Sequence, residues 1–433
     1  MNCKTTKLLF LLVFLVGAAD VSRAQDDSVS KPSRLTIGGY GEAVYNYNFY
    51  SDNVFRYSHA DRYTENKGYG RVDLPHAVIM LGYDFGHGWS IGTEVEFEHG
   101  GIEAAVEKET EETGEFEQEI ERGGEVALEQ FWVQKSFSPR LNLRMGHIVV
   151  PVGMTNNNHT PDHFFSVYRP EGENTIMPCT WHETGISLWG RTANWRYEVQ
   201  LLPGLNSNLF NESGWVHNGA ASPYEFRPAN SLATAARLDW LGIPNLRLSL
   251  SGYVGNSFNN DITTVQYPET SRYYKAKGTV LIGAFDFAYI NRWLTVRGNM
   301  DYGYLSDASL ISTRNKNQTT MTGNPYPHTP VGEQAWDASL EAGVDLFALA
   351  DWRTGGRRFY LFGRYDHYDS FVPASGWTDI EWAEKQILSA GVNYYPIPQI
   401  AIKAEAGIRL LKEQYNNEPY AVVGVTWCGF FKH

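Results

Sequence analysis

The sequence predicts an all-β protein, a transmembrane antiparallel β-barrel of about 16 strands with long loops on one side and one loop folded into the lumen. Three observations predict this fold class. Sixteen segments are candidate strands, and most of them alternate between apolar and polar residues. Their connections alternate between tight turns and long polar loops, as in bacterial outer-membrane barrels. The chain also begins with an export signal.

The first 24 residues are predicted to be a secretory signal peptide. Lys4 and Lys7 precede an apolar run over residues 8–16, which is too short to span a bilayer. Ser22, Arg23 and Ala24 then fit a small-residue cleavage site. The expected domains are therefore the signal peptide, 1–24, and the outer-membrane barrel, 25–433.

Composition excludes several classes of protein. Aromatic residues make up 14% of the chain and there are 41 glycines, which fits many short strands joined by turns. The net charge is −13, and removal of the signal peptide, whose own charge is +2, changes it to −15. An acidic chain is not expected to bind nucleic acid. Only Cys179 and Cys428 follow the signal peptide, so no disulfide framework is expected.

The expected strands can be placed to within a few residues. Short turns near residues 86, 137, 192, 243 and 397 alternate with long loops near 49–69, 99–123, 150–181, 203–230, 256–272, 305–333 and 369–381. An even strand number places both termini on the short-turn side. The expected strands are 35–47, 71–85, 88–98, 124–137, 140–150, 182–190, 194–202, 231–240, 245–255, 274–289, 292–304, 335–347, 357–368, 383–395, 398–411 and 419–431.

Side-chain alternation within the strands supports the barrel. In residues 400–411, Ile400, Ile402 and Ala404 face one side while Lys403 and Glu405 face the other. Apolar residues would face lipid and charges a wet lumen. In a soluble sandwich the apolar residues would face inward instead, and the alternation alone does not distinguish the two folds. Export, the strand number and the turn asymmetry favour the barrel. The segments 124–137 and 274–289 alternate poorly, and we expect β-bulges there.

The loop at 150–181 is the expected constriction. It is too long for an unstructured loop of a compact soluble domain, but a wide barrel lumen can hold it. Its four prolines limit its flexibility. We expect Arg169 of this loop and lumen-facing Arg144 to lie near the narrow zone. The alternative is a loop that projects outward from the surface.

The segments LEQFWVQKSFSPRLNLRMGHIVVPVG (128–153) and RPEGENTIMPCTWHETGISLWG (169–190) resemble the phosphate-selective porin O and P family, in its Bacteroidetes-type outer-membrane form. In that family, the pattern L-x-x-G-x-x-x-x-P-x-G leads into a long loop. The resemblance covers about 60 residues. It implies a 16-stranded, homotrimeric porin with loops that enter the lumen. It does not imply phosphate selectivity, because the chain has no lysine ladder.

Strand alternation and the central loop together give a set of candidate pore-lining residues. The basic members would guide anions if they formed a continuous track. Twelve acidic side chains face the same lumen as eight basic ones, which favours paired or segregated charges over a pure anion path. A wet lumen also requires a polar lining whatever its function. The candidates are Arg144, Arg169, Arg196, Arg237, Arg247, Arg297, Arg364, Lys403, Arg409, Glu94 and Glu96.

No metal, cofactor or catalytic site is predicted. The glutamate-rich loop at 99–123 is interpreted as a solvated, self-repelling segment, although it could attract cations or bind divalent ions beside lipopolysaccharide. His159, His163 and His182 lack zinc-motif spacing and are interpreted as hydrogen-bonded loop histidines. The trio His76, Asp84 and Ser90 has no specific spacing. Aromatic residues at strand ends are typical of interfacial girdles.

The sequence thus predicts an outer-membrane porin that lets small hydrophilic or ionic solutes diffuse passively. The protein would reach the outer membrane by export through the periplasm. Its expected partners are membrane lipid and lipopolysaccharide, small solutes, the outer-membrane assembly machinery and two further copies of the chain. One alternative is a structural or adhesive barrel closed by its own loops. A barrel hydrolase is a third. The solute, the ion preference and the openness of the lumen stay undetermined at this point.

Overall fold

The computed structural model describes residues 34–65, 67–99, 107–108, 118–119, 125–222, 226–261, 267–317 and 327–432. The predicted signal peptide, 1–24, lies outside these residues. So does most of the acidic loop at 99–123, of which His99 and the short strand pair β5 (Glu107–Lys108) and β6 (Gln118–Glu119) are described.

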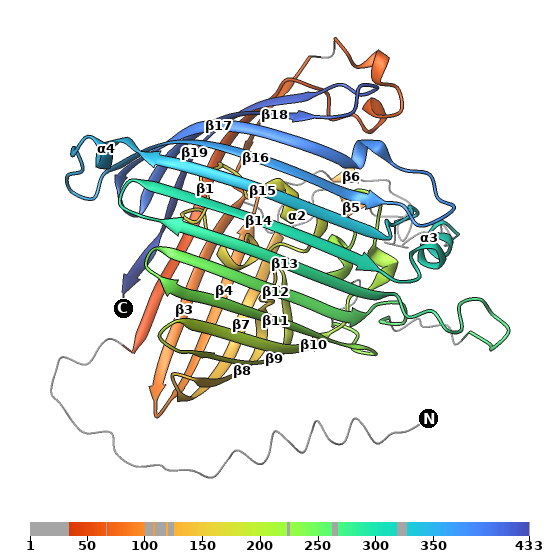
Figure 1. Ribbon diagram of the computed structural model, residues 1–433, viewed down its shortest axis with the longest axis horizontal. Helices are drawn as coiled ribbons and strands as arrows, with labels where there is room; N and C mark the ends of the chain where they lie inside the picture. The colour runs from red at the N-terminus through yellow and green to blue at the C-terminus, as the bar shows by residue number, and fades with distance from the viewer. Residues whose placement is uncertain are drawn as a thin grey trace. The chain divides into compact units, whose positions relative to one another are not determined.

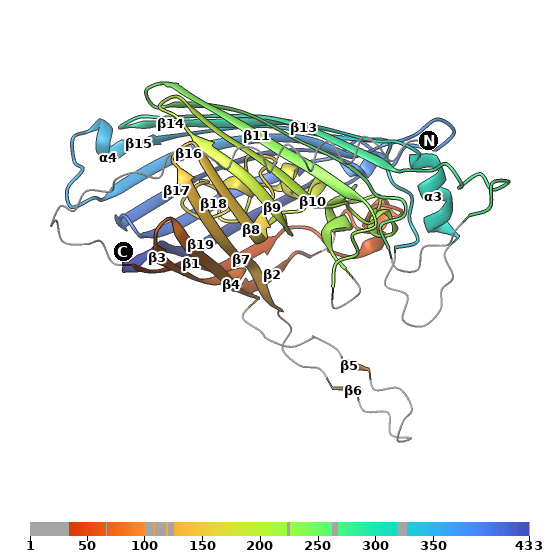
Figure 2. The ribbon, with the colours of Figure 1, turned by 90° about the horizontal axis from the view of Figure 1, so that it is seen from below.

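The described chain forms a closed antiparallel barrel of sixteen strands, as predicted (Figures 1 and 2). β2 and β3 count as one strand, because both pair with β1 on either side of an interruption at Leu74 and Pro75. The first and last strands close the ring, with Glu42 opposite Thr426. The strands are β1 (Leu35–Asn48), β2 (Tyr69–Asp73), β3 (His76–Gly86), β4 (Trp89–Glu98), β7 (Glu125–Ser138), β8 (Leu141–Val149), β9 (His182–Arg191), β10 (Trp195–Pro203), β11 (Leu232–Ile243), β12 (Leu246–Asn256), β13 (Thr279–Ile290), β14 (Leu294–Leu305), β15 (Gln334–Asp345), β16 (Arg358–Val372), β17 (Glu384–Ile397), β18 (Ile400–Leu410) and β19 (Glu418–Lys432).

The two ends of the barrel differ as the turn pattern predicts. At one end lie short turns and the single-turn helix α4 (Leu346–Leu349), on the left of Figure 1. The long loops lie at the other end and carry α3 (Ala308–Lys316). The helix α2 (Glu171–Ile176) belongs to the loop between β8 and β9 and packs against β15 and β16. No helix of the described residues has the length and apolar character needed to cross a bilayer.

One of the two predicted bulges is present. In β7 the register with β4 shifts at Glu129, since Gln130 pairs with Glu94 and Leu128 pairs with Val95. β13 pairs without a shift on both sides, so the second predicted bulge is wrong. The alternation of 274–289 looked irregular because residues 274–278 belong to the preceding loop and not to the strand.

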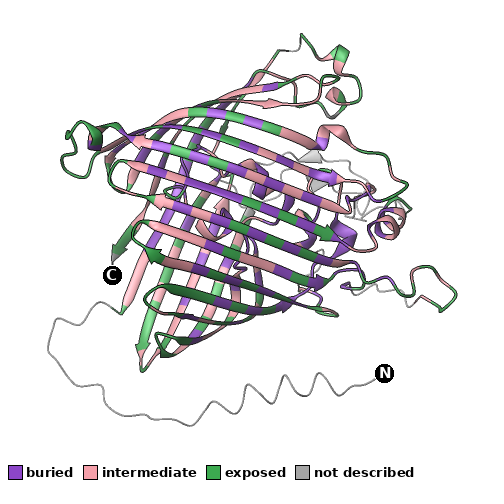
Figure 3. Cartoon of the chain, in the orientation of Figure 1, coloured by how far each residue is buried: buried purple, intermediate pink, exposed green. Residues whose placement is uncertain are grey.

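Burial alternates along the strands (Figure 3), and many charged side chains of the strands are among the buried ones. Leu250, Leu340 and Ile402 lie on the outer face, each more than half exposed. Lys403, next to Ile402, is fully buried. Exposed tryptophans lie near the short-turn end, as expected for an interfacial girdle: Trp89, Trp195, Trp293 and Trp352.

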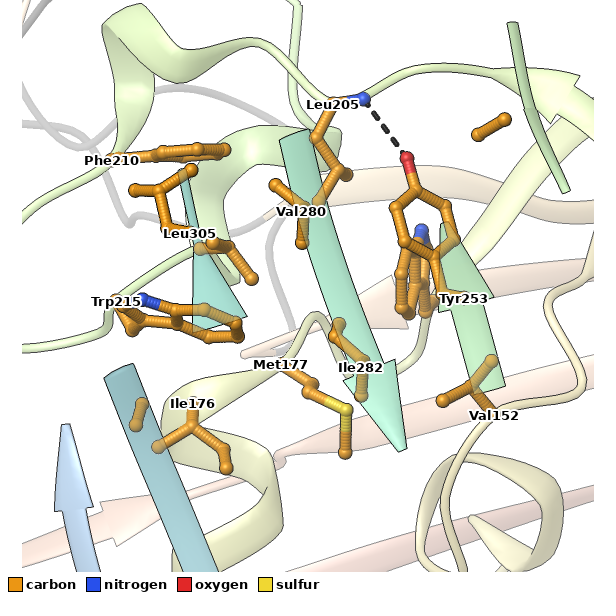
Figure 4. Packing of buried hydrophobic residues seen from close by; sticks show 14 of the residues in the cluster. Val152, Ile176, Met177, Leu205, Phe210, Trp215, Tyr253, Val280, Ile282 and Leu305 are labelled. Atoms are coloured by element: carbon orange, nitrogen blue, oxygen red, sulfur yellow. Dashed lines mark hydrogen bonds between the residues drawn. The ribbon is translucent and has the colours of Figure 1, made fainter. Parts of the chain in front are cut away.

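One part of the lumen is apolar, which the alternation pattern does not predict. The inward side chains of β13 include Val280, Ile282 and Ala284, and all three are buried. They pack with loop side chains such as Trp215 and Phe210 in the cluster of Figure 4. These inward positions accept apolar residues because the loops at 150–181 and 204–222 cover them and exclude water.

Trp215 lies at the centre of this packing. Its ring is fully buried and its Nε1 donates a hydrogen bond of 3.0 Å to the carbonyl oxygen of Gly332. The ring also occupies the space where residue 303 would place a Cβ, so that only a glycine fits there. The loops of this end therefore hold each other in place as a small soluble core would.

We expect Trp215→Ala to weaken this packing strongly. Removal of a large buried ring leaves a cavity and lowers the stability of a packed core by about 3–5 kcal/mol. Limited proteolysis of the folded barrel should then cut the chain within 204–222 much faster than in the wild type. Trp352→Ala is the matched control, since Trp352 is 69% exposed. Equal cleavage in both variants would contradict the assigned packing.

Candidate functional site

The chain from Pro151 to Trp181, called the inner loop below, folds into the barrel. Its first turn is held by Glu173, whose carboxylate accepts hydrogen bonds from the amides of Met154 (2.9 Å), Thr155 (2.9 Å) and Asn156 (3.2 Å). Gly153 lies against the same carboxylate with φ +81°, where a side chain would be strained and would collide with Glu173. Burial raises the pKa of Glu173 to about 6, although the three amides favour its charged form.

Lys403 of β18 binds the middle of the inner loop. Its ammonium donates hydrogen bonds to three carbonyl oxygens, those of Pro161 (2.7 Å), Phe164 (2.9 Å) and Ser166 (3.0 Å). Asn393 of β17 donates to the carbonyl of Phe165 at 2.9 Å. An ammonium has three donors, and all three are used on loop backbone. This lysine is thus a structural anchor of the loop.

The wall also supplies acceptors for the loop amides. Glu341 of β15 accepts from the amide of Phe165 at 3.1 Å, and Glu405 of β18 accepts from that of Val167 at 2.9 Å. The ring of Phe165 stacks on Phe362 with centroids 5.5 Å apart. These contacts fix the loop against β15–β18 through both its polar and its apolar groups.

Three wall arginines bind the loop from the β11–β14 side. Arg237 donates to the carbonyl of Gly153 at 2.9 Å, and Arg247 donates to Oδ1 of Asn158 at 3.2 Å. Both arginines also pair with Asp286 of β13. Arg297 of β14 donates to the carbonyl of His163 and pairs with Glu341 at 2.8 Å.

The helix α2 fills the space beside β15 and β16. Glu171 at its first turn accepts from Arg409 Nε at 2.6 Å and from the Tyr368 hydroxyl at 2.7 Å. Burial opposes the ionisation of Glu171, but Arg409, Lys385 and the Tyr368 hydroxyl together lower the pKa of Glu171 below its usual value. Gly172 lies so close to Asp337 of β15 that no Cβ fits, which explains the glycine between the two glutamates.

Arg169 ties the loop to the first strands of the barrel. Its guanidinium lies 3.4 Å from the Tyr40 hydroxyl and 3.8 Å from Glu96 Oε1. Burial disfavours its charge, but Tyr40, Cys179, Glu96 and Glu129 together raise the pKa of Arg169 above its usual value. It therefore stays a cation inside the barrel.

The predicted pore-lining residues all carry partners, and they do not form one row of equivalent charges. Arg364 pairs with Asp366 at 2.6 Å and lies 3.8 Å from Glu341. The residues that contact the inner loop directly are Arg237, Arg247, Arg297, Lys403 and Arg409 from the wall, with Arg169 in the loop itself and Glu94 and Glu96 facing it.

Arg144 and Arg196 lie elsewhere, near the short-turn end. Arg144 donates to Gln134 Oε1 at 3.1 Å, and its guanidinium lies 4.4 Å from the ring centre of Trp132. Arg196 is half exposed and lies 3.7 Å from Glu198. Their contacts are with wall residues of β7, β9 and β10 and not with the inner loop, so the expected placement of Arg144 beside Arg169 stays a prediction.

A cavity of about 230 Å³ lies between the inner loop and the wall formed by β1, β2 and β16–β19. Its lining brings four arginines together with three acids. Arg71, Tyr168 and Tyr420 were missed by the sequence reasoning, although Arg71 follows the inward parity of its strand. The lining residues are Asn46, Arg71, Ser166, Tyr168, Arg169, Pro170, Glu171, Asn174, Arg364, Asp366, Ile387, Ser389, Glu405, Arg409, Tyr420 and Val422.

The sequence trio of a hydrolase does not come together. Asp84 and Ser90 face each other near the β3–β4 turn, whereas His76 lies opposite Glu98 at the other end of the hairpin. Eight residues of strand separate them, about 26 Å. His76 is bound by Glu42 at 2.7 Å instead.

The three loop histidines do not converge either. His182 contacts the ring of His147 and His163 contacts Thr160, while His159 faces the carboxylate of Glu94.

Comparisons with known proteins agree with this architecture. No protein-family model matches the chain. A protein of Aquifex aeolicus (strain VF5), described as uncharacterized, is 26% identical over 403 residues, which are 91% of this chain and 79% of that protein.

Three solved barrels are similar in structure. The anion-selective porin from Comamonas acidovorans is 10% identical, with 91% and 99% of the two chains covered and a TM-score of 0.50. The outer membrane channel DcaP of Acinetobacter baumannii is 10% identical, with 91% and 97% covered and a TM-score of 0.50. Salmonella typhi OmpF, solved with daunomycin, is 12% identical, with 91% and 97% covered and a TM-score of 0.53.

The chain has the fold of the porins. At 10–12% identity, the likeness to these three structures concerns the fold alone. Membership of the phosphate-selective porin O and P family is not established by the comparisons.

We expect Lys403→Met to loosen the middle of the inner loop, because three buried carbonyls lose a charged donor. A charge-assisted hydrogen bond contributes about 1.5–3 kcal/mol, so hydrogen exchange of the amides at 162–167 should accelerate at least about tenfold. Lys135→Met is the control, since Lys135 also donates to a carbonyl, that of His87, but at an exposed turn. Unchanged exchange in the Lys403 variant would contradict the anchoring role.

Proposed function

We propose that this protein is an outer-membrane porin, a passive diffusion channel for small hydrophilic or ionic solutes. The observation that carries the proposal is the charged cavity between the inner loop and the wall. In this proposal the inner loop narrows the lumen, and the charged side chains of the cavity beside it line the path of the solute. Such an arrangement selects solutes by size and charge without a catalytic group.

The lining of the cavity supports small polar solutes over apolar ones. Arg409 and Glu171 are paired, and so are Arg364 and Asp366, which leaves fixed charges of both signs along the path. Arg71 is exposed, and its guanidinium lies 5.4 Å from the ring centre of Tyr168. Of the arginines in the lining, Arg71 is the one best placed to contact a passing ion.

One observation favours the alternative of a structural or adhesive barrel closed by its own loops. The cluster around Trp215 and Ile311 covers part of the long-loop end with apolar side chains. The channel proposal requires the side near β1, β2 and β16–β19 to remain passable. The dispersed positions of His76, Asp84 and Ser90 give a barrel hydrolase no comparable support.

Planar bilayers distinguish these functions directly. Purified, folded protein should insert with stepwise increases in conductance, because each open barrel adds a discrete aqueous path. Silent insertion of correctly folded barrels would contradict the channel proposal and favour the closed barrel.

We expect deletion of residues 156–173 to raise the single-channel conductance and weaken ion selectivity, because it removes the part of the inner loop that fills the lumen. The control deletes residues 351–355, which are exposed in the turn between β15 and β16. That variant should conduct like the wild type. If conductance and reversal potential both keep their starting values in the first variant, the inner loop is not the constriction.

We further expect Arg71→Glu to shift the reversal potential in a salt gradient toward cation preference, because it replaces a positive charge of the lining with a negative one. Arg292→Glu is the control, since Arg292 is exposed at a short turn and pairs with Asp351 outside the cavity. Equal shifts in the two variants would mean that Arg71 does not border the conducting path.

The proposal includes the cellular setting that the sequence predicts. The protein would leave the cytoplasm with the signal peptide 1–24, cross the periplasm and be inserted by the outer-membrane assembly machinery. There it would contact lipid and lipopolysaccharide and form a homotrimer, as the family resemblance implies. The outward apolar side chains of the strands support burial in a lipid bilayer.

A further inference from the structure

Three ligand-type side chains from separate parts of the chain meet where the inner loop touches β4 and β7. Glu94 comes from β4, Glu129 from β7 and His159 from the inner loop. One potential ligand atom of each lies within 4.8 Å of those of the other two. All three side chains are at least nine-tenths buried.

The β-bulge in β7 creates this meeting. Without a bulge, neighbouring residues of a strand face opposite sides of the sheet. At the bulge, both Glu129 and Gln130 lie opposite Glu94, and Glu129 turns inward, where it is 1% exposed. Bulges re-aim side chains in this way and are frequent beside functional sites.

Each of the three groups has one atom held by the protein and one atom without a hydrogen-bond partner. Glu94 Oε2 accepts from Gln130, and Glu129 Oε2 accepts from the Tyr40 hydroxyl at 3.4 Å. By hydrogen-bond geometry the Oε1 atoms of both glutamates and His159 Nε2 have no partner, while Thr180 and Glu96 are the further polar neighbours of Glu129. Buried polar atoms are normally satisfied, so three orphans at one point require an explanation.

The tautomer of His159 follows from its neighbour. Its Nδ1 lies 2.9 Å from the carbonyl oxygen of Asn156, and a carbonyl only accepts, so Nδ1 carries a proton. The neutral ring then presents a lone pair on Nε2, which lies 3.7 Å from Glu94 Oε1. A histidine that donates one ring N–H to a backbone carbonyl while the other nitrogen is free has the arrangement of a metal ligand.

A third carboxylate lies beside the three groups. Glu96 is buried next to them, and its Oε1 lies 3.8 Å from the guanidinium of Arg169 in the inner loop. Burial of several carboxylates at one place is costly without a compensating partner, and a divalent cation would be such a partner.

We propose that Glu94, Glu129 and His159 bind a divalent transition-metal ion of the zinc and manganese class. One imidazole nitrogen and two carboxylate oxygens suit such ions, whereas Mg²⁺ and Ca²⁺ prefer oxygen ligands alone. Ligand atoms about 2.1 Å from a metal lie at most about 4.2 Å apart, so binding draws the three groups inward by several tenths of an ångström. A fourth position remains for water or for Glu96, whose Oε1 also lacks a hydrogen-bond partner.

The bound ion would fasten the inner loop to the wall. His159 follows the short 3-10 helix at Asn156–Asn158, whose start is held by Glu173. Lys403 and Arg409 anchor later parts of the loop to β18, a different strand of the wall from β4 and β7. A metal at His159 would add a link to β4 and β7, independent of whether the barrel conducts.

Metal binding by the folded, detergent-solubilised barrel tests this proposal. After chelation and dialysis, calorimetric titration with Zn²⁺ should show one site per chain in the wild type, with Mn²⁺ binding more weakly. Mg²⁺ should show no site of comparable affinity. His159→Ala and Glu129→Gln should each weaken Zn²⁺ binding at least about tenfold. His163→Ala is the matched control, because His163 is an exposed histidine of the same loop, and it should bind like the wild type.

Two outcomes would overturn the proposal. One is a wild-type barrel without a stoichiometric Zn²⁺ site, in which case a protonated His159 balances the glutamates instead. The other is unchanged binding in His159→Ala.

The heat-modified gel mobility of each variant reports whether the barrel is folded. As a second readout, Co²⁺ should give a visible absorption spectrum in the wild type and the His163 variant but not in the His159 variant. The result does not depend on conductance, so this proposal and the channel proposal can fail separately.

Discussion

The structure depends on one constraint: the backbone groups of a chain placed inside the barrel must find hydrogen-bond partners. The inner loop has little regular structure of its own, with one six-residue helix and a single 3-10 turn. Its carbonyls and amides therefore bind side chains of the wall. Lys403 serves three carbonyls, while Glu341 and Glu405 serve the amides of the same segment. Many of the charges inside the barrel are thus explained by the loop they hold.

The inner loop is attached differently on its two sides. Towards β11–β14 it buries Val152, Met177 and Trp181 in an apolar cluster. Three arginines of the same strands, Arg237, Arg247 and Arg297, add hydrogen bonds to the loop. Towards β15–β18 its contacts are mainly charged and hydrogen-bonded, apart from the ring of Phe165. Apolar packing excludes water, whereas the charged side borders the cavity of about 230 Å³. The same loop therefore fills one part of the lumen with apolar packing and borders a polar cavity in another.

Local sequence patterns predicted the barrel well, because strand alternation and turn residues are local properties. The sixteen strands, the turn asymmetry and the inward-folded loop are all present. The parity of β18 placed Lys403 inside, but nothing in its neighbours indicates that its partners are Pro161 and Phe164, about 240 residues earlier. Such pairings arise only when the sheet closes. Arg144 illustrates the limit, since parity gave its face but not its height along the barrel axis.

The bulge and the apolar patch of the lumen show two further limits. Irregular alternation in 124–137 indicated a bulge, yet it could not say that Glu129 would be the residue turned inward. The inward side chains of β13 read as an ordinary apolar stretch, because the loops that cover them, including Trp215, are distant in sequence. In both cases the side-chain environment is determined by segments that no short window contains.

The order of the chain adds a consequence for assembly of the barrel. The inner loop leaves β8, but Lys403, Glu405 and Arg409 stand on β18, next to the strand that closes the ring with β1. An intermediate that lacks β18 has the loop but none of these anchors, and its carbonyls and amides must stay hydrated or unpaired. Completion of the ring and settling of the loop are therefore coupled events. The hydrogen bonds between the loop and β18 therefore stabilise the closed barrel relative to an intermediate in which the last strands have not yet paired.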